Sequence, residues 1–180
     1  MTGIDRDEPR FDDMAAEFPP ELDLAVAIVG LVAVLFGAGA AGGPLLLSVA
    51  RALTGALFLG VVTDAMLLGH WYLVQPGLAR GPIIELVRWT GVLWLPETVV
   101  MLWPTGMGSV LDGTIDDGYN GLLAWFWVAC VVTTIALVFV ARAALREREY
   151  SAVMAATGLM YLAILTAFGQ DIVARLLLAP

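Results

Sequence analysis

The chain has 180 residues, of which 60% are hydrophobic and only 14% are charged, and its mean hydropathy is +0.87. Soluble domains are typically about half apolar and about a quarter charged, so this composition excludes an ordinary water-soluble domain. The formal net charge is −8, and the basic residues are all arginine, with no lysine. Because no run of basic residues occurs, the sequence excludes nucleic acid as a partner.

Residues 1–21 form an acidic segment that prolines interrupt, including the pair Pro19-Pro20. The segment lacks the basic start and apolar middle of a secretory signal, so we expect the first apolar helix to remain in the mature protein. Its composition predicts a flexible N-terminal tail that is too short for a catalytic domain. A transmembrane helical domain is expected over residues 22–180.

Five long apolar runs follow the tail. Each is close to the ~20 residues that a helix needs to cross ~30 Å of hydrocarbon. Breaks such as Gly42-Gly43-Pro44 and Gln75-Pro76-Gly77 separate them. The sequence therefore predicts an all-α integral membrane bundle of about five transmembrane helices. We expect the spans at residues 22–41, 52–74, 83–103, 122–141 and 150–176.

The placement of arginine predicts the orientation, because short cytoplasmic loops retain positive residues. With five spans, the tail, the turn that contains Arg80 and the charged turn 142–149 share one side, whereas Arg51 and Arg175 lie on the other. We therefore expect a cytoplasmic N-terminus in a multi-pass protein of the bacterial cytoplasmic (inner) membrane. The glycine- and aspartate-rich loop 104–120 then faces outward and has room for a short surface helix.

A glycine-rich stretch from Gly37 to Gly42 matches the G-x-G-x-x-G pattern of dinucleotide-binding loops. That function requires a strand before the glycines, and here they end an apolar helical run. We interpret them, with Gly39 and Gly43 four residues apart, as small residues that allow close helix packing.

Two acidic residues lie deep within predicted spans. Asp64 falls near the centre of span 52–74, where inserting an aspartate costs ~3 kcal/mol. Glu97 follows Pro96, which removes a backbone hydrogen bond from span 83–103 and locally opens the helix. Counted by helical rise from the turn that joins these spans, Asp64 lies at a depth of ~15 Å and Glu97 at ~21 Å. We expect the two carboxyl groups to be near neighbours.

No arginine is expected at that depth, so ionised Asp64 and Glu97 would lack a countercharge. One hypothesis is that at neutral pH at least one of them is protonated, or that the pair holds a cation, which makes them a proton or cation site. The alternative is structural: each protonated acid bonds to Thr63, Thr98 or a backbone carbonyl and fastens two helices together.

A polar aromatic layer is expected near the cytoplasmic ends of the second and third spans. It contains His70, Trp71 and Tyr72 on one helix and Arg88 on the next. Such a layer can bind a quinone, because histidine or arginine donates to a carbonyl oxygen while aromatic rings stack on the quinone ring. The alternative is an ordinary interfacial belt of aromatic side chains.

Other cofactors and catalytic sites find little support. A haem held by two histidines is excluded in one chain because His70 is the only histidine, which leaves a His70–Met66 pair or a haem shared between two copies. Cys130 is interpreted as a packing residue. Asp171 and Arg175, spaced i to i+4, predict a structural ion pair. No Ser-His-Asp, zinc-ligand or Walker pattern occurs, so neither catalytic residues nor a metal site is assigned.

Three functions remain open. The small extramembrane part favours an accessory or anchor membrane subunit of a bacterial electron-transfer (respiratory) complex, which contributes a quinone pocket and a proton path and is not an enzyme on its own. The second is a small proton- or cation-coupled transporter or channel that uses Asp64 and Glu97. The third is a structural assembly membrane protein. The expected partners are the lipid bilayer and either other membrane subunits or further copies of the chain.

Overall fold

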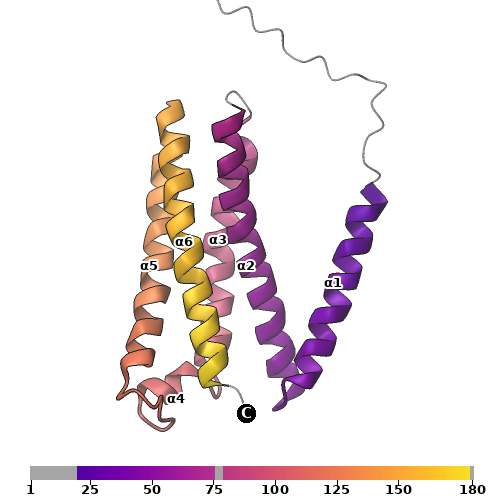
Figure 1. Cartoon of the computed structure of the whole chain (residues 1–180), viewed down its shortest axis with the longest axis vertical. Coiled ribbons are helices and arrows are strands. Elements are labelled where there is room, and N and C mark those ends of the chain that lie inside the picture. The colour runs from indigo at the N-terminus through magenta and orange to yellow at the C-terminus, as the bar shows by residue number, and fades with distance from the viewer. Residues whose placement is uncertain (1–19, 76–78, 179–180) are drawn as a thin grey trace, which may run out of the picture. The chain divides into compact units, whose positions relative to one another are not determined.

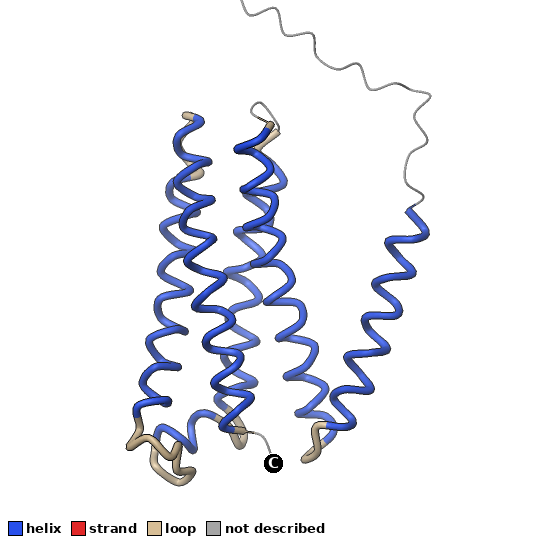
Figure 2. Tube along the Cα trace, viewed as in Figure 1, coloured by secondary structure: helices blue, strands red, loops and turns tan. Residues whose placement is uncertain are grey.

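The structure, a computed structural model, describes residues 20–75 and 79–178, so the predicted tail lies outside the described residues apart from its last two positions. All regular structure in the described ranges is α-helical, as Figures 1 and 2 show. The helices are α1 (Pro20–Ala40), α2 (Leu45–Val74), α3 (Gly81–Leu102), α4 (Met107–Leu111), α5 (Leu122–Ala144) and α6 (Tyr150–Leu177).

The largest difference from the predicted boundaries is at the start of α2. The helix begins at Leu45, directly after Pro44, seven residues before the expected start at position 52. Pro44 has φ −65° and ψ 114°, an extended conformation that suits the residue before a helix. Arg51 therefore lies in the second turn of α2.

The chain forms two compact units, Met1–Ala33 and Val34–Pro180, and the division falls within α1. In the first unit, apolar side chains of α1 such as Leu24, Val26 and Val29 are exposed. A helix that is apolar on all sides is typical of a membrane span or a buried helix.

Helices α2, α3, α5 and α6 of the second unit form an up-and-down four-helix bundle (Figure 1). Helix α2 packs against α3 and α6, and α5 packs against the same two helices. One core cluster includes the fully buried Phe58, Val62 and Val87, and a second gathers around Met101 and Trp127. Small residues let these helices approach: a Cβ on Gly69 of α2 would meet Thr157 Oγ1 of α6 at 2.6 Å.

The glycines near the end of α1 do not have the predicted packing role within the described chain. A Cβ added at Gly37, Gly39 or Gly43 would meet no atom within 4 Å. Gly42 and Gly43 instead have positive φ values of 75° and 73°, which glycine adopts readily in the turn before α2.

The short helix α4 lies in the expected loop and packs two of its side chains into the bundle core. Met107 is fully buried and Val110 is 5% exposed, and both belong to the core cluster around Met101 and Trp127. Helix α4 thus covers one end of the bundle between α3 and α5 (Figure 1).

Three described helices, α2, α5 and α6, are long and apolar enough to cross a membrane. Residues 24–40 of α1 form a shorter apolar helix. Helix α3 carries three charged residues, Glu85, Arg88 and Glu97, which lower its apolar character. The fold is thus all-helical and has helices suited to a bilayer.

Candidate functional site

A polar network connects α2, α3 and α6 near the end of the bundle that α4 covers. Its side chains are Arg51 and Thr54 from α2, Glu97 from α3, and Asp171 and Arg175 from α6. They are separated by up to 124 positions in the chain. The bundle topology brings them together because α2 packs between α3 and α6.

Glu97 is the most deeply buried acidic side chain in the described residues, at 1% exposed. Its Oε2 lies 2.5 Å from Thr54 Oγ1, which also lies 2.9 Å from the carbonyl oxygen of Ala50, so the single hydroxyl proton of Thr54 serves one of these two contacts at a time. Its Oε1 is buried and has no hydrogen-bond partner in the described part of the chain. An unsatisfied buried carboxyl oxygen is costly, so it requires a functional or structural explanation.

Asp171 and Arg175 form the ion pair that their spacing predicts. Arg175 Nε lies 2.9 Å from Asp171 Oδ1 and 2.8 Å from Oδ2, and the Asp171 side chain is only 8% exposed. Arg175 Nη2 also donates to the carbonyl oxygen of Arg51 at 3.2 Å. Gly55 makes this contact possible, because a Cβ there would lie 2.4 Å from Arg175 Nη2.

The guanidinium group of Arg51 bonds to backbone carbonyls at the end of α3. Nε donates to Val100 at 3.0 Å and Nη2 donates to Thr105 at 2.5 Å. Gly106 provides the space, since a Cβ there would lie 2.9 Å from Arg51 Nη2 and 2.0 Å from the carbonyl oxygen of Met101. Arg51 thereby ties the start of α2 to the loop after α3.

Arg51 bonds to the carbonyl oxygen of Val100, three residues after Glu97, and Thr54, three residues after Arg51, bonds to Glu97 itself. The expectation that no arginine lies at the depth of Glu97 is therefore wrong. Arg51 comes from the start of α2 and Arg175 from the end of α6, and both helix ends lie at the end of the bundle opposite the α2–α3 turn.

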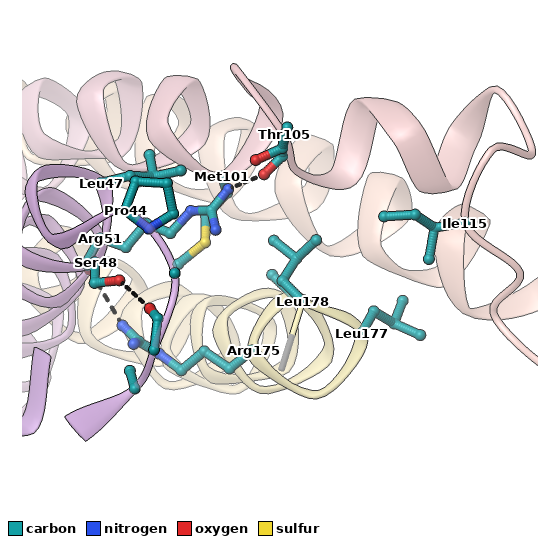
Figure 3. A pocket seen from close by; sticks show the side chains of 14 residues that line it. Pro44, Leu47, Ser48, Arg51, Met101, Thr105, Ile115, Arg175, Leu177 and Leu178 are labelled. Carbon is teal, nitrogen blue, oxygen red and sulfur yellow. Dashed lines mark hydrogen bonds between the residues drawn. The ribbon is translucent and has the colours of Figure 1, made fainter. Parts of the chain in front are cut away.

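A pocket of about 610 Å³ opens beside this network (Figure 3). Arg51 and Arg175 line it together with apolar side chains that include Leu47, Met101 and Leu178. Glu97 lies one turn before Met101 on α3. Met101 lines the pocket and Glu97 does not, so the acid lies next to the pocket, inside the bundle. An opening with two guanidinium groups and apolar walls is chemically suited to a ligand with both polar and apolar parts.

The structure does not bring Asp64 to Glu97. The α2 residue that bonds to Glu97 is Thr54, ten positions before Asp64, which is ~15 Å along the helix. Asp64 is exposed, whereas Glu97 is buried. The expected neighbour relation is therefore wrong, because the packing of α2 against α3 places Thr54, and not Asp64, opposite Glu97.

The four residues proposed for a quinone site point in different directions. Tyr72 is buried and donates to the carbonyl oxygen of Ala79, whereas Trp71 is 54% exposed and donates to Gln75 at 3.1 Å. His70 is exposed, and its Nδ1 lies 3.2 Å from the hydroxyl of Tyr161 on α6. Three consecutive residues of a helix spread over its circumference, so they do not line one cavity.

Arg88 is the fourth of these residues and lies on the exposed face of α3. It pairs with Glu85 at 3.3 Å, with both side chains about half exposed, and its guanidinium lies 6.0 Å from the ring of Trp89. None of the four residues lines the pocket of about 610 Å³.

Asp117, which the sequence analysis did not single out, is a loop residue whose side chain caps the start of α5. The side chain is 7% exposed and accepts backbone hydrogen bonds from Tyr119 and Gly121 at Oδ1, and from Leu123 and Ala124 at Oδ2. The hydrogen bond from Gly121 and the other backbone N–H groups lower the pKa of Asp117 below its ordinary value. The signal in the sequence is the Asp-Gly-rich loop directly before an apolar helix.

Together, the fold and the network define a helical bundle of membrane-type helices with a charged cluster at one end, in which Glu97 and Asp171 are buried. Comparison of the chain with protein-family models, curated proteins and solved structures finds no match.

Proposed function

We propose that the chain is an accessory membrane subunit of an electron-transfer complex in the bacterial cytoplasmic membrane. In this proposal the protein crosses the bilayer five times, with α1, α2, α3, α5 and α6, and its N-terminus is cytoplasmic. The apolar helices support a membrane location, and the arginine distribution supports the orientation. The small share of chain outside the helices supports a subunit that acts with partners.

The observation that carries the proposal is the buried carboxyl group of Glu97, whose Oε1 has no partner among the described residues. A carboxyl group with a free oxygen can take up and release a proton through a water molecule. Arg51 and Arg175 lie on one side of it, next to the pocket. We therefore propose that Glu97 carries a proton for the complex.

Polar access to Glu97 is proposed from one end only. Between Glu97 and the other end of the bundle, the core side chains of α2 are apolar and fully buried, namely Phe58, Val62 and Ala65, so they offer a proton no polar group. The buried hydroxyl groups of Thr90 and Thr157 donate to carbonyl oxygens of their own helices. A chain with a one-sided proton site favours a subunit that completes its path with a partner over a self-sufficient transporter.

A quinone contact through His70, Trp71 and Arg88 also requires a partner, because these side chains are exposed and none of them lines the pocket of about 610 Å³. In the proposal, a neighbouring subunit covers this exposed surface and completes the quinone site.

Purification of the tagged full chain from its native membrane in a mild detergent tests the partner class. We expect co-purification of subunits with a visible redox spectrum and extractable quinone. A chain that purifies alone and moves protons into vesicles overturns the proposal in favour of a proton-coupled transporter. A chain with neither redox partner nor proton flux overturns it in favour of a structural assembly protein.

Replacement of Glu97 by glutamine tests the proton site within the purified complex. Glu97→Gln keeps the shape of the side chain but removes the proton-carrying group, so proton uptake coupled to turnover should fall at least about tenfold. Glu85→Gln is the matched control, because it makes the same change at an exposed position of the same helix. Equal proton uptake in the two variants would exclude Glu97 as the carrier.

A further inference from the structure

The charge of Arg51 is not neutralised by a bonded carboxylate in the described part of the chain. The bonds from its guanidinium group go to two neutral carbonyl oxygens, those of Val100 and Thr105. Asp171 is already engaged by both of its oxygens with Arg175, and Glu97 bonds to Thr54. Arg51 also lies close enough to Arg175 for the two positive charges to repel each other.

Both arginines face the same pocket, which has a volume of about 610 Å³ (Figure 3). This volume lies within the ~300–1,000 Å³ range of pockets that hold small ligands. An anion there would compensate the charge of Arg51 and reduce its repulsion with Arg175, and it would gain charge-assisted hydrogen bonds. The polar part of the pocket therefore selects a negative group.

The remaining walls select an apolar body. Ten of the fourteen lining residues are apolar or glycine, and those with large apolar side chains come from four different segments. They are Leu47, Met101, Ile115, Leu177 and Leu178. A small, fully hydrated anion would leave these walls without a contact, whereas an acyl chain would cover them.

We propose that this pocket binds an anionic amphiphile, with its phosphate or carboxylate group at Arg51 and Arg175 and its acyl chain along Leu47, Met101 and Leu178. The ligand is an anionic phospholipid of the bilayer or a free fatty acid, since both present the same chemistry. The site lies beside Glu97 but does not require Glu97 to carry a proton, so it is independent of the function proposed above.

Native mass spectrometry of the full chain, released from detergent micelles, measures the binding directly. The probes are dioleoyl phosphatidylglycerol, oleate, dioleoyl phosphatidylcholine and inorganic phosphate. We expect at least one of the two anionic amphiphiles to bind about tenfold or more tightly than phosphatidylcholine. Tight binding of phosphatidylglycerol alone identifies the bilayer as the source, and tight binding of oleate alone identifies a free fatty acid.

Two variants test the position of the ligand. Arg51→Gln should weaken binding of the anionic amphiphile about tenfold, because it removes the uncompensated charge. Leu47→Trp fills the pocket and leaves every charge in place, so it should weaken binding even if Arg51→Gln perturbs the fold. Arg142→Gln is the matched control, because Arg142 is exposed in the last turn of α5 and does not line the pocket.

Three results would overturn the proposal. One is equal binding of phosphatidylglycerol, oleate and phosphatidylcholine, which would indicate unselective lipid attachment. Another is inorganic phosphate binding as tightly as the amphiphiles, which would leave the apolar walls without a role. The third is a loss with Arg142→Gln that matches or exceeds the loss with Leu47→Trp, which would place the anionic amphiphile at the exposed arginines of the charged turn.

Discussion

The two ends of the four-helix bundle hold polar residues in different ways. At the end with the α2–α3 turn, Arg80 donates to the carbonyl oxygen of Glu147 at 2.6 Å and Tyr150 donates to that of Tyr72 at 2.8 Å. Those bonds join turns through neutral backbone groups. At the end that α4 covers, charged side chains from three helices meet beside a pocket, and Glu97 is buried among them.

The difference shows what makes polar residues converge in a helical bundle. His70, Trp71 and Tyr72 are adjacent in sequence, yet their side chains spread around α2 because each residue turns the helix by about 100°. Arg51 and Arg175 are far apart in sequence, yet they meet because Gly55 lets α6 approach α2. A site in this protein therefore depends on close helix approach more than on sequence proximity.

The largest expected effect is at the charged end, where Gly106→Ala would break the contact between α2 and the loop after α3. An added Cβ would lie 2.0 Å from a backbone oxygen, that of Met101, so the backbone must shift. We expect a loss of about 3 kcal/mol in the free energy of unfolding. Thermal unfolding in detergent measures it, with Gly60→Ala as the control, because Gly60 has no neighbour within 4 Å. Equal melting temperatures would contradict the described packing.

A smaller effect is expected away from the charged end, where Gly69→Ala brings a Cβ to 2.6 Å from Thr157 Oγ1. The neighbour here is a side chain that can adjust in part, so we expect a loss of about 1–2 kcal/mol. Adding Thr157→Ala should restore part of the loss because it removes the atom in conflict. Purely additive effects in this double-mutant cycle would show that the two positions are not in contact.

Asp117→Asn should lower the melting temperature by several degrees at pH 7, because the loop before α5 loses an ionised acceptor. The folded pKa of Asp117 lies below its unfolded value, so the ionised group stabilises the fold above about pH 4. This contribution is lost as the pH falls through the lowered folded pKa, so the two proteins should converge in acid. Asp116→Asn is the control, since Asp116 accepts one backbone bond, from Gly118. A difference that persists unchanged in acid would argue against this role.

The smallest expected effect is that of Asp64→Asn. Asp64 is exposed on α2 and takes no part in the described hydrogen bonds, and a neutral asparagine is no more costly than an aspartate within a span, so we expect a loss of stability below about 0.5 kcal/mol. Thermal unfolding of Asp64→Asn is compared with that of Glu97→Leu, which removes a buried hydrogen-bonded acid. A larger change in stability, of either sign, for Asp64→Asn than for Glu97→Leu would contradict the burial of Glu97.

The sequence by itself determined the helices, because long apolar runs with glycine and proline breaks leave helical structure as the way to satisfy the backbone in an apolar environment. It also indicated the spacing of Asp171 and Arg175, since an i to i+4 pair depends only on one helix. The order of the predicted spans also placed Arg51 and Arg175 on the same side of the membrane, and therefore at the same end of the bundle. The number of crossings and the orientation stay predictions.

Only the tertiary structure decided which partners these residues meet. Glu97 bonds to Thr54 and not to Asp64, because the packing of α2 against α3 and α6, with close approaches at Gly55 and Gly106, sets the register of three helices. Hydropathy does not encode that register, since moving one helix along its neighbour by a turn keeps every residue equally apolar. The packing of side chains into the facing helix selects one register, and that selection creates both the buried acid and the pocket beside it.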